Sequence, residues 1–206
     1  MKDFGLVVIG AHSGVHLKDL ISEYNNQNIL LVEPVPYNYE VLEKYYNNYD
    51  NFFICKNAII DQARIDNFFY VKKDSIPKLG KHWASGIGSF DKNHILSHKT
   101  KRFDVKESDI EVTTIKCLSF KSLLQKHNIT SIDKLMMDVE GAEYKILKSI
   151  NYKEIIIKNI IFEKKHFDGP FKEGKKLNEI KNLLRYNKYE LIDLDEENIE
   201  AKKINL

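Results

Sequence analysis

The sequence has few of the features that mark several classes of protein. Its 206 residues include two cysteines and four prolines, and neither sign of charge dominates, because 32 Lys and Arg face 30 Asp and Glu. Cys55 and Cys117 lack CxxC spacing and each lies in an apolar run, so we expect two buried, reduced thiols. A net charge of +2 with both signs interspersed gives no basic face, so nucleic-acid binding is not expected.

Long apolar runs are also missing. No stretch approaches the roughly 20 apolar residues that a membrane-spanning helix needs. The first residues, Met1 to Phe4, lead straight into a strand-like segment without a recognisable export signal, so we expect a cytoplasmic protein. The proportions of hydrophobic (43%) and charged (30%) residues are ordinary, and the length suits a single α/β domain covering residues 1–206.

The first 60 residues alternate between two kinds of apolar pattern. Short apolar runs at 6–9, 29–32 and 52–55 predict strands, whereas helical spacing at about 15–24 and 37–48 predicts helices. Strands that alternate with helices in this way form a parallel sheet with right-handed crossovers.

Residues 66–114 interrupt this rhythm. They contain one strand-like run at 68–71, a stretch of small residues at 83–90 and three histidines, His82, His94 and His98. A connection of this length without strong periodicity is usually a functional loop or an insertion. We expect a hairpin and a lid that lies over the site.

Regular patterns return after residue 114. We predict helices at 119–127 (with Ser119 as the N-cap), after Gly141, and at 171–186, and strands ending before Asp138 and over 155–163. Residues 189–194 and 199–204 alternate on either side of a polar turn, which indicates an antiparallel hairpin. The fold predicted from these patterns is a mostly parallel sheet that ends in an antiparallel terminal hairpin.

Two acids follow the most apolar of these strands. Asp138 and Glu140 come directly after Leu135-Met-Met137, at the carboxyl end of a strand, where ligands bind in open α/β sheets. Acids there can remove a proton from a hydroxyl, hold a metal ion such as Mg²⁺, or balance a cationic ligand. Glu143, one turn into the following helix, is explained by the helix dipole alone. Glu163 and His166 form a second candidate pair at the end of the next strand.

Three shorter segments could bind a ligand at the same edge. The loop from Gly10 to Gly14 offers backbone amides at a helix start, but it fails GxGxxG at His12 and GxxxxGK[ST] at Val15. Glu33 ends the second strand, where an acid can accept hydrogen bonds from both hydroxyls of a ribose. Asn57 follows the third strand; it is either a turn residue or a residue whose side-chain amide contacts a base. His12 and His16 have the spacing of metal ligands without a third ligand, so no metal site is expected.

One longer segment carries a resemblance. Residues 132–147, IDKLMMDVEGAEYKIL, resemble the hallmark IDxLKIDVEGAExxVL of the FkbM family of S-adenosylmethionine-dependent methyltransferases. Other family motifs follow the same order along the chain: the first glycine motif at 9–14, the EPxPxxxxxL segment at 32–42, a third motif at 57–58, a serine-bearing stretch at 85–89 and the end of the fifth strand at 161–166.

The resemblance implies a fold, a reaction and a set of residues. The fold is a Rossmann-like class I methyltransferase with a seven-stranded sheet, an antiparallel last strand and helices on both faces. The reaction is methyl transfer from S-adenosylmethionine to an oxygen, often a hydroxyl of a sugar, a glycan or a small natural product. On this basis Glu33 and Pro34 would bind the ribose, and Asn57 and Ala58 the adenine. The methionine portion would be bound by Gly10, Ala11, His12 and Gly14. Asp138 and Glu140 would lie beside the methyl group and the acceptor, and Asp138 would also border the cofactor. His166 is a second candidate base.

The chain departs from the family pattern at two positions. Val8 replaces the usual acid two residues before the first motif glycine, and Met136 replaces the usual lysine before the hallmark aspartate. Val8 leaves open weaker cofactor binding, a compensating residue, or a catalytically inactive binding or regulatory module. A metal-dependent methyltransferase with Asp138, Glu140 and Glu163 as oxygen ligands is a further alternative. A nicotinamide oxidoreductase suits the fold but fails its glycine fingerprint.

Overall fold

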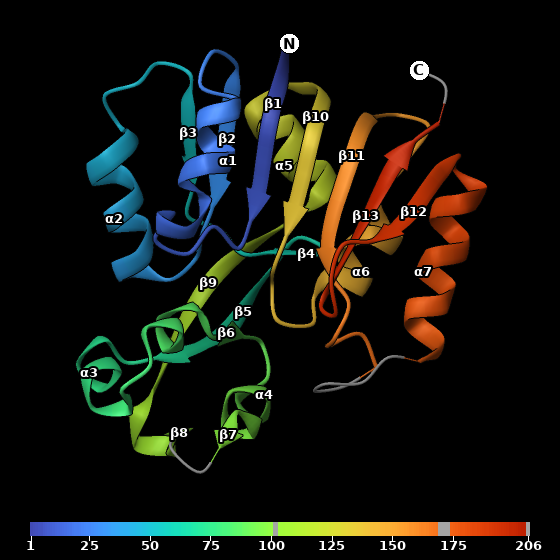
Figure 1. Ribbon diagram of the computed structural model, residues 1–206. Coiled ribbons are helices and arrows are strands. Elements are labelled where there is room, and N and C mark those ends of the chain that lie inside the picture. The colour runs from blue at the N-terminus through green and yellow to red at the C-terminus, as the bar shows by residue number, and fades with distance from the viewer. Residues whose placement is uncertain (101–102, 169–173, 205–206) are drawn as a thin grey trace.

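A seven-stranded sheet forms the centre of the computed structural model, which describes residues 1–100, 103–168 and 174–204 (Figure 1). The strand order is β12-β13-β11-β10-β1-β2-β3. All neighbours pair in parallel except β13, which runs antiparallel to both β11 and β12. This confirms the predicted mostly parallel sheet with an antiparallel terminal hairpin. The strands are β1 (Lys2–Ile9), β2 (Asn28–Val32), β3 (Phe52–Cys55), β10 (Ile129–Met137), β11 (Ile156–Glu163), β12 (Tyr189–Asp193) and β13 (Asn198–Lys203).

Helices cover both faces of the sheet, as predicted. Alternate residues of β1 belong to different hydrophobic clusters, Val7 and Ile9 to one and Leu6 and Val8 to the other. The first cluster includes residues of α5 (Phe120–His127), α6 (Glu143–Ser149) and α7 (Lys175–Tyr186). The second includes residues of the 3-10 turn Val15–Leu17, α1 (Lys18–Glu23) and α2 (Pro36–Tyr46). Each face of the strands therefore has its own apolar layer.

The insertion lies at the carboxyl ends of the parallel strands (Figure 1). Its frame is an antiparallel pair, β5 (Arg64–Val71) with β9 (Ile110–Ser119), in which Arg64 pairs with Cys117 and Val71 with Ile110. A separate apolar cluster that includes Val71, Ile95 and Phe103 stabilises it. The other elements are β4 (Ile59–Ile60), α3 (Ile76–Leu79), β6 (Gly88–Ser89), α4 (Lys92–Ser97), β7 (Lys99–Thr100), β8 (Phe103–Asp104) and 3-10 turns at Lys73–Ser75, His82–Gly86 and Glu107–Asp109.

The structure differs from the sequence-based prediction mainly around this insertion. The hairpin and lid expected over about 66–114 were predicted with one strand-like run, at 68–71, and no strand was assigned to residues 110–119, which form β9. The β-branched residues of β9 favour an extended chain, but few of its side chains are buried, so it lacks an apolar alternation. The helix expected over 171–186 is observed as α7, and residues 169–173 lie outside the described residues, as do 101–102 of the insertion.

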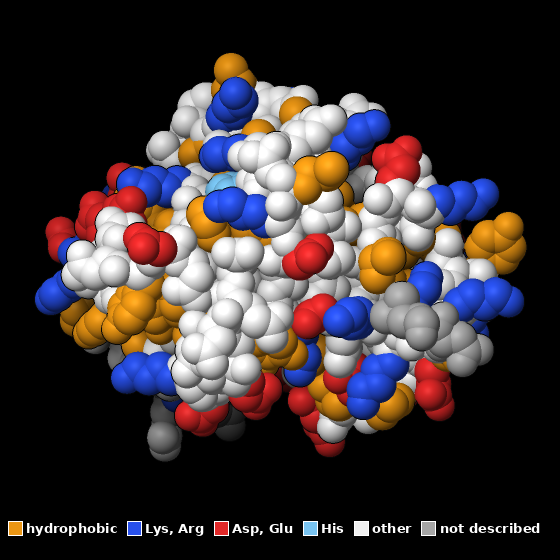
Figure 2. Space-filling view, turned by 90° about the horizontal axis from the view of Figure 1, so that it is seen from above, with side chains coloured by type: hydrophobic (Ala, Val, Ile, Leu, Met, Phe, Trp, Pro, Cys, Tyr) orange, Lys and Arg blue, Asp and Glu red, His pale blue; other side chains and the backbone are white. Residues whose placement is uncertain are grey.

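Three bulk expectations can be compared with the described residues. Cys55 and Cys117 are buried free thiols, as predicted. None of the helices in the described ranges is both long enough and apolar enough to cross a membrane. Acidic and basic side chains are interspersed on the face of the molecule drawn in Figure 2, as the balanced composition indicates.

Candidate active site

The ends of β2, β1 and β10 bring the glycine loop close to the acid-bearing turn. The amides of Gly10 and Ala11 both donate to the Val32 carbonyl (3.0 Å each), and the Asp138 amide donates to the Ile9 carbonyl (3.0 Å). Gly10 has φ +88°, and a Cβ at this position would lie 1.8 Å from the Asp138 carbonyl oxygen. Only glycine therefore permits this approach of the two loops.

Glu33 holds the glycine loop through its carboxylate. Its Oε2 accepts a hydrogen bond from the His12 amide (2.8 Å), and its Oε1 accepts one from the Val35 amide (2.9 Å). Burial raises the pKa of Glu33 to about 7, although these amide hydrogen bonds act in the opposite direction. Each carboxylate oxygen has two acceptor lone pairs, so the group can still accept hydroxyl donors from a ligand.

The raised pKa of Glu33 makes stability depend on pH. Above its ordinary pKa of 4.5 the folded state keeps a proton that the unfolded chain loses, so stability falls as pH rises towards about 7. We expect Glu33→Gln to have a shallower loss of stability between about pH 5 and pH 8 than the wild type. Urea unfolding at several pH values measures this slope, and Glu23→Gln, an exposed acid on α1, should leave it unchanged. Parallel slopes for wild type and Glu33→Gln would contradict the prediction.

The turn after β10 is shaped by Glu143. Its Oε1 accepts a hydrogen bond from the Val139 amide (2.6 Å), and its Oε2 accepts one from the Gly141 amide (2.9 Å). The side chain is fully buried, and this burial raises the pKa of Glu143 to about 7. The helix dipole alone was expected to explain Glu143, so this contact was not predicted. The acid two residues after Gly141 was the available signal.

Two acids beside this turn, Asp138 after β10 and Glu163 at the end of β11, lie in different environments. Asp138 is exposed, and its partial removal from water and the nearby charge of Glu140 raise its pKa to about 6. Burial and the charge of Asp138 raise the pKa of Glu163 to about 8, against the effect of its ion pair with Lys165 (2.6 Å). Carboxylate oxygens of Asp138, Glu143 and Glu163 lie within 4.8 Å of one another, so these acids weaken one another's ionisation.

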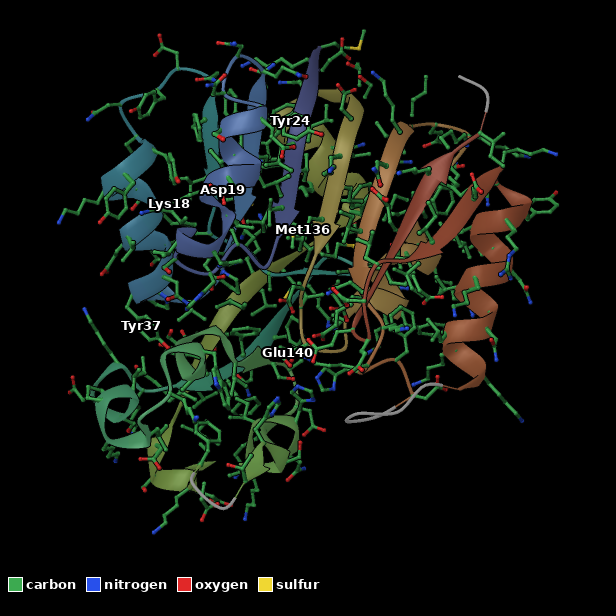
Figure 3. All side chains as sticks on the ribbon, viewed as in Figure 1. Lys18, Asp19, Tyr24, Tyr37, Met136 and Glu140 are labelled. Carbon is green, nitrogen blue, oxygen red and sulfur yellow. The ribbon has the colours of Figure 1, made fainter. Side chains whose placement is uncertain are left out.

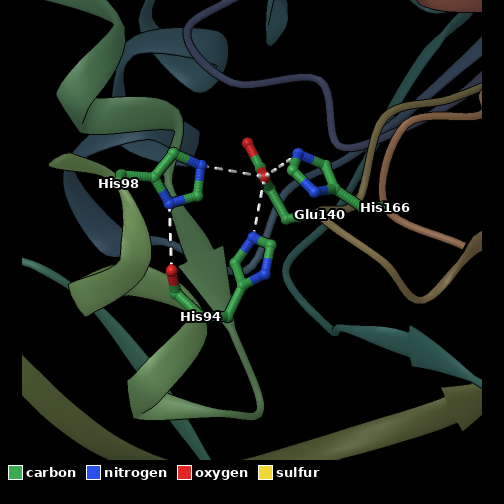
Figure 4. Close-up of side chains that lie close together, drawn as sticks. All are labelled: His94, His98, Glu140 and His166. Atoms are coloured by element: carbon green, nitrogen blue, oxygen red, sulfur yellow. Dashed lines mark hydrogen bonds and ion pairs between the residues drawn. The ribbon is translucent and has the colours of Figure 1, made fainter. Parts of the chain in front are cut away.

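Glu140 belongs to a second group of side chains. Its Oε2 lies 2.9 Å from His94 Nε2, 3.6 Å from His98 Nε2 and 3.5 Å from His166 Nε2 (Figure 4). Burial opposes ionisation of Glu140, but its close contacts with His94 and His98 outweigh burial and lower its pKa. Sequence analysis expected Glu140 and His166 near the site and gave His94 and His98 no role. Figure 3 shows Glu140 between the sheet and the insertion.

Two cavities border these residues. One of about 760 Å³ is lined by Gly10, Pro34, Asn57, Ala58, Glu140 and His166, among others. The other, of about 890 Å³, is lined by Gly10, His12, Glu33, Asp138, Glu140 and Glu163, among others. Both volumes suit a small molecule, and the two cavities share Gly10 and Glu140. Ala11 and Gly14, also predicted to bind the cofactor, line neither cavity.

Comparison with known proteins decides the family. A model of the methyltransferase FkbM domain matches residues 9–191. The chain belongs to the FkbM methyltransferase family. This confirms the resemblance drawn from residues 132–147, while a search of curated proteins found no match.

One of three similar solved structures supports the fold of this FkbM chain. The FkbM methyltransferase of Methylobacillus flagellatus KT aligns with a TM-score of 0.52 and 11% identity over 97% of this chain. The alignment covers 43% of that protein, so this chain spans less than half its length. A precorrin-6y C5,15-methyltransferase of Geobacter metallireducens GS-15 aligns with a TM-score of 0.47 and 10% identity over 98% of this chain and 82% of that one. Aeropyrum pernix fibrillarin, solved with natively bound S-adenosyl-L-methionine, aligns with a TM-score of 0.46 and 12% identity over 97% of this chain and 66% of that one. At 11% identity, the similarity to the Methylobacillus flagellatus protein shows the fold alone.

Hydrogen bonds fasten the insertion of this FkbM protein to the glycine loop. Ser85 Oγ lies 2.6 Å from His12 Nε2, and the side-chain amide of Asn38 donates to the Ser85 backbone carbonyl (2.8 Å). Tyr37, labelled in Figure 3, donates from its hydroxyl to the Val71 carbonyl (2.8 Å). His12, expected to contact the cofactor, therefore also positions the insertion. Among the described residues, His12 and His16 belong to no group of three potential metal ligands.

Asn57 has structural partners as well. Its amide nitrogen donates to the Lys116 carbonyl, and its amide oxygen accepts from Lys126 Nζ, each at 2.8 Å. These contacts tie the end of β3 to β9 and α5. Asn57 therefore has a structural role, and it also lines the first cavity.

The two departures from the FkbM pattern are neighbours in the sheet. Val8 of β1 pairs in register with Met136 of β10, and both belong to the apolar layer beside α1 and α2. Val8 is 1% exposed. Where the family pattern places an acid and a lysine, two apolar side chains pack together, so neither change leaves a buried charge without a partner.

Proposed function

We propose that this protein transfers a methyl group from S-adenosylmethionine to a hydroxyl of a sugar, a glycan or a small natural product. The observation that carries the proposal is the buried Glu33 carboxylate, which holds the glycine loop and lines the same cavity as Asp138. An acceptor for ribose hydroxyls and a candidate base thus lie at the ends of β2 and β10, the two strands that flank β1.

The residues at this edge suit the parts of the cofactor. Glu33 accepts the ribose hydroxyls on its remaining lone pairs, and Pro34 lies beside it. The loop from Gly10 to Gly14, including Ala11 and His12, surrounds the methionine portion, and Asn57 and Ala58 line the cavity that takes the adenine. When bound, S-adenosylmethionine supplies an electrophilic methyl group on a sulfonium sulfur.

Asp138 is the base in this proposal. Methyl transfer to a hydroxyl is an in-line displacement, so the protein must align the acceptor and remove its proton. With a pKa of about 6, Asp138 is largely ionised at neutral pH and can accept that proton. Burial lowers the pKa of His166 to about 4, which makes its imidazole a weaker candidate. Glu140, held among three histidines, borders the acceptor.

The insertion over about 66–114 is the acceptor-binding lid of a single domain in this proposal. Its segments line both cavities, Phe68 and Phe90 in the first and Trp83 and Ser85 in the second. Aromatic side chains such as these bind the apolar faces of sugars and of natural products. Acceptor choice would therefore be changed by substitutions in the insertion and not by those at Glu33.

Substitution of Glu33 tests the cofactor assignment. We expect Glu33→Ala to weaken S-adenosylmethionine binding by roughly 10- to 100-fold, because hydrogen bonds to a charged group contribute about 1.5–3 kcal/mol. Isothermal titration calorimetry measures the change, with Glu23→Ala on α1 as the control. Circular dichroism shows whether Glu33→Ala remains folded. Glu33→Gln keeps the size of the side chain, so it separates a lost ribose contact from a loosened glycine loop. Unchanged affinity in both variants would remove the ribose assignment.

Turnover tests the reaction itself. The protein is incubated with methyl-labelled S-adenosylmethionine and a panel of sugars, glycosides and hydroxylated natural products, and label transfer is followed by mass spectrometry. We expect a product that carries the methyl group on oxygen. A product methylated only on carbon or nitrogen would contradict the proposal.

A non-catalytic module is the second candidate function, and Val8 is the observation that favours it. The usual acid at this position is absent, and the side chain is buried in the core. Such a module would bind the cofactor and transfer no label to any acceptor in the panel. Binding and label transfer therefore distinguish the two functions.

A further inference from the structure

We propose that His94, His98, Glu140 and His166 form a zinc site that fastens the insertion to the parallel sheet. The inference does not depend on methyl transfer, because it rests on four side chains and their positions. The ligand atoms of these residues all lie within 4.8 Å of one another.

Three separate segments bring the four residues together. His94 lies on α4 and His98 directly follows it, and residues four apart share one face of a helix. Glu140 and His166 follow β10 and β11, which are adjacent parallel strands and so end at the same edge of the sheet. Two candidate ligands thus come from the insertion and two from the sheet.

The distances match those within a metal site. The three histidine Nε2 atoms lie 2.9, 3.5 and 3.6 Å from Glu140 Oε2. In a tetrahedral site with bonds of about 2.0–2.1 Å to zinc, neighbouring ligand atoms lie about 3.3 Å apart. The ring centroids are 4.9 Å apart for His94 with His98 and with His166, and 5.9 Å for His98 with His166 (Figure 4).

Hydrogen bonding to Glu140 explains this arrangement only in part. One nitrogen, His94 Nε2 at 2.9 Å, is within ordinary hydrogen-bond distance of Glu140 Oε2. The other two are 3.5 and 3.6 Å from that oxygen, beyond the usual range. A single cation bound between the four side chains would be coordinated by all of them. Glu140 also has φ +55°, a conformation that costs a non-glycine residue roughly 1 kcal/mol or more and that aims its carboxylate at the histidines.

A contact outside the cluster orients one of the imidazoles. His98 Nδ1 lies 3.0 Å from the His94 carbonyl oxygen. A proton on Nδ1 donates to this carbonyl, so the lone pair of Nε2 faces Glu140. Histidines that bind metals are typically oriented by such a hydrogen bond from the other ring nitrogen.

The donor set indicates which ion would bind. Three imidazole nitrogens and one carboxylate oxygen suit zinc, whereas magnesium and calcium prefer sites made of oxygen ligands. Four protein ligands complete a tetrahedral zinc coordination shell, which is typical of structural sites. The ion would therefore hold α4 and His98 against the turns after β10 and β11, beside both cavities.

Metal analysis of the full chain tests the proposal. We expect the metal-free protein to bind one zinc ion per chain in calorimetry and to melt at a higher temperature with zinc than with chelator. X-ray absorption at the zinc edge should show imidazole scattering from three ligands at about 2.0–2.1 Å. This measurement uses the wild-type protein, so it does not depend on whether a variant folds.

Matched variants complete the test. His94→Gln and His98→Gln should weaken zinc binding by more than about 100-fold and should lose the melting response to zinc. His16→Gln, which changes an exposed histidine outside the cluster, should bind zinc like the wild type. Absence of zinc binding by the wild type, equal zinc affinity in all variants, or fewer than two imidazole ligands in the absorption spectrum would overturn the proposal.

Discussion

Replacement of Asp138 by asparagine should lower methyl-transfer turnover by roughly 100- to 10,000-fold, the usual contribution of a general base. The variant keeps the size of the side chain and removes the group that accepts the proton. It also removes one negative charge close to Glu140 and Glu163, so we expect thermal stability to be equal or higher. Its S-adenosylmethionine affinity should change by less than about tenfold, because Glu33, and not Asp138, is the residue proposed to bind the ribose.

The comparison requires an acceptor identified in the label-transfer panel. Turnover number and Michaelis constant are measured for wild type, Asp138→Asn and Asp133→Asn. Asp133 lies on β10, the strand that precedes Asp138, and pairs with Lys158 (2.7 Å) away from both cavities, so its substitution should leave turnover unchanged. Full activity of Asp138→Asn on that acceptor would show that the base is another residue.

Replacement of Glu143 by glutamine should destabilise the fold by about 1–3 kcal/mol, the cost of leaving a buried amide without its acceptor. The carboxylate accepts hydrogen bonds from the Val139 and Gly141 amides in a fully buried position. A glutamine amide offers one oxygen and turns an NH₂ group towards the other amide. Each kcal/mol lowers the melting temperature by about 2–4 °C in a chain of this size.

Urea unfolding and hydrogen exchange measure this loss. The Val139 and Gly141 amides should exchange faster in Glu143→Gln, because one of them loses its acceptor. Glu154→Gln, which changes an exposed acid, should unfold like the wild type. If Glu143→Gln were as stable as the wild type and its turn amides equally protected, the carboxylate would have no role in shaping the turn.

The sheet could be predicted because its pattern is local. Alternating strands and helices indicate parallel pairing, and residues 189–204 carry the period-two pattern of a hairpin. Strand β9 was missed because it pairs with β5 across 38 intervening residues (72–109) and buries few of its side chains. Its pairing partner cannot be read from the neighbouring sequence.

The candidate site was predicted only where residues follow strands. Positions such as Glu33 and Asp138 are fixed by the ends of parallel strands, which meet at one edge of the sheet. The contact of Glu140 with His94 and His98 depends on how the insertion folds back over that edge, which no local pattern specifies. Glu143 was misread because an acid at a helix start has a simpler explanation in the dipole.

Calorimetric titration of the folded chain with S-adenosylmethionine and with its demethylated product measures whether the protein binds this cofactor. We expect one binding site for each compound, with both affinities reduced in Glu33→Ala. No measurable binding of either compound to protein shown to be folded by circular dichroism would contradict this expectation.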